Sequence, residues 1–358
     1  MIEKYYSGVI EQIYNRIGKE TRNIVMANYS NDFSIENLEV IRRYQSNEDN
    51  VFFAYSEFSY NTLVGAYEPF LDIICNMHRR FIGGSFDDFQ KECGVYYLHR
   101  QVLNSYYETG ECFREETVLL NEVAYEQRRM TMAIADMLKK LSEVKPLMIV
   151  INRFQMASKS SIETIKYLID NPCANIGIVL GVNAIVKGTD STVEVWDRIV
   201  ESLEDRSAIY YIGSAGPLKN NVKTTNDDEL YITMNFEQSI QEASNIMEFL
   251  DFEQARRGCR IIEHKLKFED AWIDEKSLRR FYMVYARTSV LLGEMSKAIE
   301  LTNEYKALIP ENDSEHYLSL YYFMKGTCYM YQGKLEKAGN SAKSAYDYAV
   351  LAEDDTLI

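Results

Sequence analysis

The chain has 358 residues, a length typical of two domains that each bury an apolar core. Its composition of 46% hydrophobic, 26% charged and 13% aromatic residues is that of a globular protein and excludes an intrinsically disordered chain. The formal net charge is −15 and no block is rich in Lys or Arg, so we expect no nucleic-acid partner and no membrane-surface partner.

The N-terminus predicts an amphipathic helix over residues 2–17 rather than a targeting signal. Its apolar residues recur at helical spacing: Val9, Ile10, Ile13 and Ile17. No segment has the apolar core of a signal peptide or reaches the roughly 18 apolar residues of a membrane span. The six cysteines are scattered, which predicts reduced and mostly buried thiols. The sequence therefore predicts a cytoplasmic protein.

Five short apolar runs follow at wide intervals, each about as long as a strand. They are nearly continuous rather than alternating, as in strands that are buried on both faces. The runs lie at residues 23–29, 51–58, 146–154, 175–183 and 207–214. Helical patterns alternate with them, and several fall between the second and third runs. This alternation predicts a three-layer α/β domain with a five-stranded, mostly parallel sheet.

A turn-rich stretch, AGPLKNNVKTTNDDEL at residues 215–230, ends the alternation of strands and helices. Beyond it the pattern is helical almost throughout. We therefore expect an α/β domain over residues 1–215, a linker over 216–238 and helical repeats over 239–358.

Three of the C-terminal helical segments share an apolar residue followed three positions later by Ala. They are FEQARRG (252–258), MSKAIEL (295–301) and LEKAGNS (335–341), whose alanines are 43 and 40 residues apart. Gly293 and Gly333 precede the last two segments. This pattern resembles the tetratricopeptide repeat, in which a Gly-containing turn joins two helices and a small residue sits where they pack. The spacing is longer than the usual 34 residues and the first segment lacks the turn glycine, so a plain helical bundle is the alternative.

The resemblance to tetratricopeptide repeats implies a protein or peptide partner. The first helix of each repeat usually lines the concave face in this family, and four tyrosines on the predicted first helices are candidates for partner binding: Tyr282, Tyr285, Tyr321 and Tyr322. Aromatic residues at this spacing are also typical of a core. The repeats continue to the end of the chain without a polar capping helix, which predicts either a free-standing regulator or the front part of a longer protein.

The segment NRFQMASKSSI, residues 152–162, resembles without gaps the third-strand motif DDLHWADPSSL of the signal-transduction ATPases with numerous domains. Ala157, Ser160 and Ser161 are identical. In that family the first two acidic residues hold magnesium and polarise water. Asn152 and Arg153 stand at these positions here, and an Arg places a positive charge where the cation would bind.

The phosphate-binding loop is also altered. P-loop ATPases have GxxxxGK[ST] after the first strand, whereas this chain has ANYSNDFSIENL at residues 27–38, without Gly or Lys. The resemblance, which covers residues 2–213, therefore implies a degenerate P-loop ATPase-like domain. Its vestigial nucleotide site would contain Asn28, Tyr29, Ser30, Asn31, Asn152 and Arg153.

The spacing of His and Cys residues fits no metal site, and no hydrolase signature is present. We therefore expect no catalytic residue, no metal and no cofactor. The leading hypothesis is a non-catalytic regulatory or sensory scaffold, acting in bacterial signal transduction or transcriptional control, that binds a protein through its repeats. The alternatives are an active or nucleotide-sensing ATPase that uses ATP and magnesium at a non-standard site, a repeat adaptor capped by its first domain, and an unrelated α/β domain.

Overall fold

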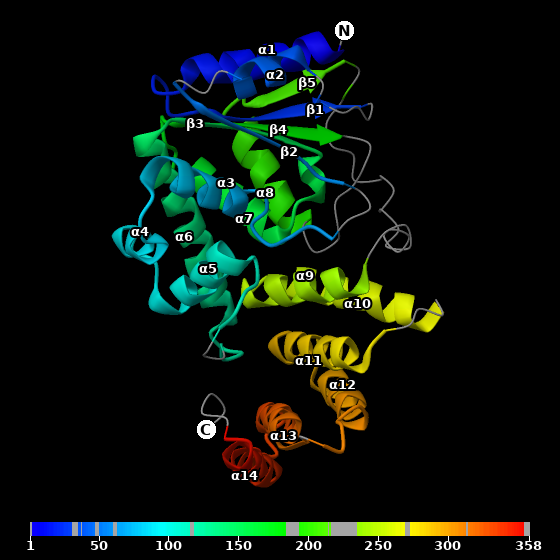
Figure 1. The fold of residues 1–358 in the computed structure, drawn as a ribbon. Helices are drawn as coiled ribbons and strands as arrows, with labels where there is room; N and C mark the ends of the chain where they lie inside the picture. Colours follow the sequence, from blue (N-terminus) through cyan, green and yellow to red (C-terminus); the bar gives the residue numbers. More distant parts are fainter. Residues whose placement is uncertain are drawn as a thin grey trace. The chain divides into compact units, whose positions relative to one another are not determined.

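The computed structural model describes residues 2–30, 35–36, 38–46, 50–59, 63–114, 118–183, 193–213, 215, 235–268, 273–312 and 314–353. The chain divides into two compact units (Figure 1). The α/β unit comprises Met1–Gly110 and Gln127–Thr233, and the helical unit comprises Glu111–Glu126 and Met234–Ile358.

A five-stranded sheet forms the centre of the α/β unit. Its strands are β1 (Ile24–Tyr29), β2 (Phe52–Glu57), β3 (Leu147–Asn152), β4 (Ile176–Asn183) and β5 (Ile209–Ile212). All neighbouring strands are parallel, and their order is β2-β3-β4-β1-β5. Every residue of β3 and β4 is buried, as expected for strands covered on both faces. The predicted α/β domain and its five strands are confirmed.

Helices cover both faces of this sheet (Figure 1). α1 and α2 lie on one face, and α3, α7 and α8 lie on the other. The connection from β1 to β2 runs along the sheet in the opposite direction to the other connections, and right-handed crossovers therefore place its helix on the opposite face. The helices of this unit are α1 (Ile2–Arg16), α2 (Glu39–Ser46), α3 (Phe70–Met77), a π-helix (His78–Ile82), α4 (Phe86–Glu92), α5 (Tyr97–Thr109), α6 (Val123–Val144), a 3-10 helix (Phe154–Met156), α7 (Lys159–Asp170) and α8 (Val193–Glu204).

The core beneath α1 explains why the chain begins with an amphipathic helix. Tyr6, Ile10 and Ile13 are fully buried and belong to one apolar cluster with side chains of α2 and of all five strands. Three or four apolar residues at this spacing form a single stripe along a helix, which is the face that packs on a sheet. The predicted helix is confirmed, and it ends at Arg16.

Three helical hairpins form most of the helical unit. They are α9 (Phe236–Glu248) with α10 (Phe252–Phe268), α11 (Glu275–Leu291) with α12 (Met295–Ala307), and α13 (Ser314–Tyr331) with α14 (Leu335–Leu351). Ala255, Ala298 and Ala338 are each the fourth residue of the second helix of a hairpin. Ala255 and Ala298 are fully buried, as a close helix-helix contact requires. The helical C-terminal region is confirmed, whereas its tetratricopeptide character stays a prediction.

The same turn closes all three hairpins. In the last two, Gly293 and Gly333 have left-handed backbone angles, and the following amide bonds a carbonyl five residues earlier. Leu250 takes this position in the first hairpin, with φ of 68°, and Asp251 N donates to Ile246 O at 3.1 Å. This bond pattern is the Schellman motif that ends many helices. The first hairpin therefore forms the turn without the glycine that marks it in the sequence.

The segment Glu111–Glu126, which we call the strap, follows α5, includes the first four residues of α6 and belongs to the helical unit. The alternation of strands and helices predicts a single domain over residues 1–215. The chain instead leaves the α/β unit after α5, contributes the strap to the helical unit and returns within the first turn of α6.

Candidate functional site

Parallel α/β sheets bind ligands beyond the carboxyl ends of their strands, where neighbouring strands send their connections in opposite directions. In this sheet the neighbours β1 and β4 meet that condition, because β1 connects to β2 and β4 connects to β5. Asn28 and Tyr29 end β1, Asn152 ends β3 and Asn183 ends β4. The fold therefore brings Asn28, Tyr29 and Asn152 of the predicted vestigial site to one edge. Asn31 lies outside the described residues.

Side chains of the protein itself fill this edge near Asn152. Tyr29 Oη donates a hydrogen bond of 2.6 Å to Asn152 Oδ1, and both residues are fully buried. The rings of Tyr6 and Tyr29 meet edge to face at 6.3 Å. Burial is the main cause that raises the pKa of the Tyr6 phenol well above its usual value, so the phenol stays neutral.

Gly181 of β4 makes room for this cluster. A Cβ atom placed on Gly181 would overlap the Tyr6 hydroxyl and lie 2.8 Å from Asn152 Oδ1. Asn152 Oδ1, at the position of the first acidic residue of the motif, thus accepts a hydrogen bond from Tyr29.

Arg153 is paired within the protein as well. Its Nη1 lies 3.0 Å from Glu57 Oε1 at the end of β2, and the two side chains are 20% and 17% exposed. The hydroxyl of Tyr55 also donates to Glu57. Arg153 has a φ of 54°, a left-handed conformation that costs a non-glycine residue about 1 kcal/mol. The Glu57 carboxylate at the end of β2 is therefore paired with a guanidinium.

The remaining residues of the motif have structural roles. Ser158 is the N-cap of α7, and its Oγ accepts a hydrogen bond from Ser161 N. Ser160 Oγ accepts from Tyr67 N at 3.0 Å, and Ser161 Oγ donates to Glu68 O at 2.8 Å. A serine and an aspartate cap a helix about equally well, so Ser158 keeps the local geometry without the charge of the family's third acid. Ser30 follows β1 in a bend.

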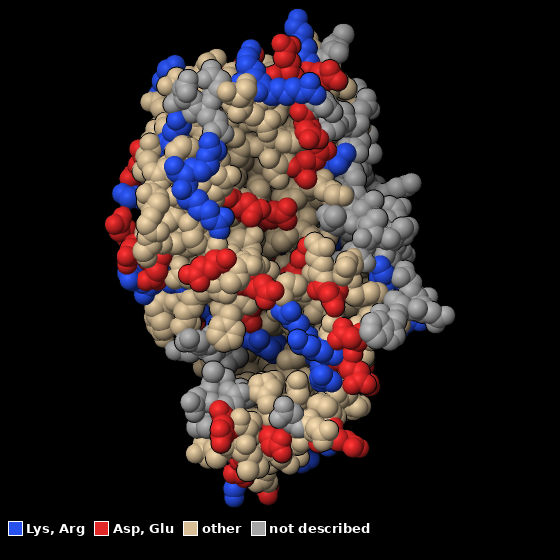
Figure 2. All heavy atoms as spheres, viewed as in Figure 1, with Lys and Arg blue, Asp and Glu red and all other residues tan. Residues whose placement is uncertain are grey.

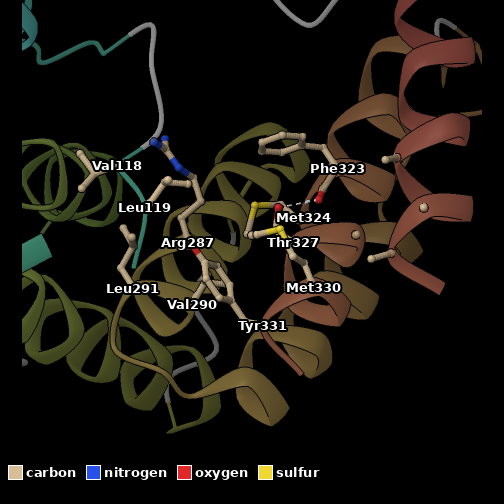
Figure 3. Close-up of a pocket in the computed structure, with 14 residues that line it drawn as sticks. Val118, Leu119, Arg287, Val290, Leu291, Phe323, Met324, Thr327, Met330 and Tyr331 are labelled. Carbon is tan, nitrogen blue, oxygen red and sulfur yellow. Dashed lines mark hydrogen bonds between the residues drawn. The ribbon is translucent and has the colours of Figure 1, made fainter. Parts of the chain in front are cut away.

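The helical unit contains a second candidate site, a largely apolar cavity of about 470 Å³ that we call the groove (Figure 3). The strap, α11, α13 and α14 form its walls. Its lining includes Leu119, Val290, Phe323, Thr327, Met330 and Gly339. Phe323 and Met330 are 43% and 44% exposed, so the groove presents large apolar side chains to solvent. Its volume is within the range of about 300–1,000 Å³ that is usual for ligand sites.

An apolar stripe continues from the groove along α14. Gly339, Ala342, Tyr346 and Val350 recur at helical spacing and are all exposed. At 1.5 Å per residue the stripe is roughly 16 Å long. An exposed apolar surface of this kind, flanked by polar residues, commonly marks an interaction site.

A buried ion-pair network anchors the strap beside the groove. Glu248 on α9 lies 3.8 Å from Arg114 of the strap and 2.9 Å from Arg287 of α11, which also lines the groove. The side chains of Arg114 and Glu248 are only 2% and 7% exposed. Burial lowers the pKa of Arg114, and the charge of Glu248 opposes that shift.

The four tyrosines proposed from the sequence lie elsewhere on the first helices. Tyr285 and Tyr321 are buried, where Lys297 and Lys325 contact their rings. Tyr282 and Tyr322 are partly exposed, and Tyr322 stacks on Tyr348. None of the four lines the groove. Phe323 and Met330, seven residues apart on α13, mark the groove in the sequence, but an apolar pair at this spacing is also typical of a core.

The six cysteines are free thiols. Burial raises the pKa of Cys75 and Cys93 to about 12, so these thiols stay protonated. Within the described ranges, no three His, Cys, Asp or Glu side chains are grouped so as to share a metal ion. No helix in the described part of the chain is long and apolar enough to span a bilayer.

Comparison with known proteins assigns the chain to no family: no protein-family model matches the sequence, and no curated protein matches it.

Proposed function

We propose that this protein is a non-catalytic regulatory scaffold that binds a protein partner through the groove of its helical unit. In this proposal the α/β unit is a degenerate relative of the signal-transduction ATPases, and the hairpins are divergent tetratricopeptide-like repeats. The protein acts in the cytoplasm, by binding rather than by turnover.

The groove is the observation that carries the proposal. Its walls are largely apolar, and the exposed stripe on α14 extends them well beyond the cavity. A small molecule would fill the cavity and leave Tyr346 and Val350 in water, whereas a polypeptide would cover both. Met324 and Met330 add flexible side chains that adapt to different partners. Acidic and basic side chains are interspersed on the face drawn in Figure 2, so the apolar surface, rather than a charged field, supports recognition.

The α/β unit supports the non-catalytic half of the proposal. A metal-dependent phosphoryl transfer needs anionic oxygens beside the cation and cationic groups on the phosphates. Asn152 is already bonded to Tyr29, and Glu57 is already paired with Arg153. Binding of magnesium at this edge would therefore break interactions that the folded protein has made.

Peptide selection tests the binding half. We expect random displayed peptides selected against the full chain to carry apolar side chains and to lose binding when Thr327→Trp fills the groove. Lys343→Trp, at an exposed position of α14 that does not line the groove, is the matched control and should leave binding unchanged. Selected peptides that bind the Thr327→Trp chain equally well would rule out the groove as the partner site.

Thermal unfolding with and without ATP and magnesium tests the non-catalytic half. A ligand present at a hundred times its Kd adds about 2.7 kcal/mol of stability, which raises the midpoint of a domain of this size by roughly 5 °C or more. We expect no measurable shift at millimolar ATP. A magnesium-dependent rise would instead identify the α/β unit as a nucleotide sensor.

A further inference from the structure

The strap is held on the helical unit in the way that a bound peptide would be. Its described residues before Leu120 form neither helix nor strand. Cys112 N donates to Asn245 Oδ1 and Leu120 N donates to Tyr331 Oη, each at 2.9 Å. Arg114 Nη2 donates to Glu248 O at 2.9 Å. Asn245 and Tyr331 on helices thus bind main-chain amides of an irregular segment, and Arg114 of that segment binds the main chain of α9 in return. A helical surface recognises an extended peptide through contacts of this kind.

Two strap side chains form one wall of the groove. Figure 3 shows Val118 and Leu119 on one side of the open space, with Phe323 and Met330 across it. Val118 is 8% exposed, whereas Leu119 is 46% exposed. The strap therefore fills part of an apolar site and leaves the rest open.

The open part suits a further length of polypeptide. Gly339 lies on the far wall, and a Cβ atom placed on it would meet nothing within 4 Å, so a main chain has room to approach α14. The Met330 side chain offers an adaptable apolar contact beside it. The helical unit already holds one irregular segment, the strap, through apolar contacts and main-chain hydrogen bonds. The open part of the groove offers further apolar side chains beyond the strap.

The strap also connects the groove to the α/β unit through the chain. α6 begins at Val123 within the strap and continues to Val144. β3 starts at Leu147 and ends at Asn152. The chain therefore runs from the strap through α6 into β3.

We propose that the groove binds an extended peptide segment of a partner that carries adjacent apolar side chains, and that Val118 and Leu119 of the strap compete with it for the same site. The proposal rests on partner binding by the groove and adds its regulation. Since the strap is attached to the site, its effective concentration is high, and an incoming peptide binds only the fraction of molecules whose strap has left.

The test uses a labelled synthetic peptide with the strap sequence, residues 111–126, as the probe for the full-length protein. Val118→Ser combined with Leu119→Ser weakens the internal competitor and leaves the other walls intact. We expect this double variant to bind the probe roughly tenfold more tightly than the unmodified chain, because the apparent Kd falls as the open fraction rises. Adding Thr327→Trp to the double variant should abolish the binding.

Phe113→Ser is the matched control, because Phe113 is a 60% exposed apolar strap residue that does not line the groove. It should bind the probe as the unmodified chain does. Leu119→Ser alone weakens the internal strap but not the probe, and it should tighten binding to an intermediate degree. Because Leu119 is 46% exposed, this milder variant keeps the test decisive if the double variant does not fold.

The outcomes separate the two proposals. Equal affinity of the unmodified and double-variant chains, with binding abolished by Thr327→Trp, would leave the groove as a peptide site and overturn the competing role of the strap. Absence of binding to the double variant and to Leu119→Ser would also overturn it, since the strap sequence would then have no affinity for the groove. Selection of unrelated peptides that need the groove would still support partner binding in that case.

Discussion

Replacement of Glu248 by Gln is expected to destabilise the helical unit by about 3 kcal/mol, because it removes the carboxylate that pairs with the buried guanidinium of Arg114. Glu248 lies between Arg114 and Arg287, and the side chain of Arg114 is only 2% exposed. Gln keeps the shape and one acceptor but leaves the Arg114 guanidinium buried beside a neutral amide. Urea unfolding, followed by hydrogen exchange of peptides from the helical unit, measures the loss.

Glu294→Gln is the matched control for this prediction. Glu294 pairs with Arg256 at 2.7 Å, but the two side chains are about equally exposed, at 31% and 29%. A pair in contact with water contributes at most about 1 kcal/mol. If Glu248→Gln lowers the free energy of unfolding no more than Glu294→Gln does, the ion pairs that anchor the strap are not buried.

Replacement of Gly181 by Ala is expected to destabilise the α/β unit by about 2 kcal/mol, the usual cost of an extra methyl group in a well-packed core. The new Cβ would overlap the Tyr6 hydroxyl and lie 2.8 Å from Asn152 Oδ1 and 3.3 Å from Ile151 O. Two of these three neighbours cannot move without breaking the Tyr29 hydrogen bond or the sheet. Hydrogen exchange of peptides from the central strands, in urea, measures the loss.

A double variant tests whether overlap with the Tyr6 hydroxyl causes the loss of stability in Gly181→Ala. Tyr6→Phe removes the hydroxyl that the Ala methyl would overlap, so the two changes together should cost at least about 1 kcal/mol less than their sum. Gly8→Ala is the control, because nothing lies within 4 Å of its added methyl on α1, and it should stabilise the unit by about 0.5–1 kcal/mol. Additive costs of Gly181→Ala and Tyr6→Phe would contradict the packing described here.

The architecture of the α/β unit could be predicted because its signals are local. Each buried strand is a nearly continuous apolar run, and each predicted run contains one strand within it. β5 differs most from the predicted pattern of buried strands, because it has only four residues and its Tyr211 side chain, at the edge of the sheet, is 47% exposed. The three helical hairpins were likewise indicated by the recurring alanines, since a close helix contact needs a small residue at one fixed position.

The candidate sites could be predicted only in part, because their contacts join distant segments. The motif correctly placed Asn152 and Arg153 at the end of a strand. Nothing in it indicated that Tyr29, 123 residues away, would bond Asn152. The bond from Leu120 N to Tyr331 spans 211 residues, and the strap has no periodicity that distinguishes it from a surface loop.

The sequence by itself determined which segments become strands and helices, because burial on both faces of a sheet and close helix packing each leave a short-range pattern of residue types. Tertiary structure alone decided what these elements enclose. The hydroxyl of Tyr6 lies against Gly181, Glu57 neutralises Arg153, and Glu248 holds Arg114 of the strap beside an open apolar groove. Each of these contacts joins residues that are far apart in the chain. The energies of hydrogen bonds and ion pairs depend on the distance between the groups and on their burial, and no local sequence pattern records either quantity.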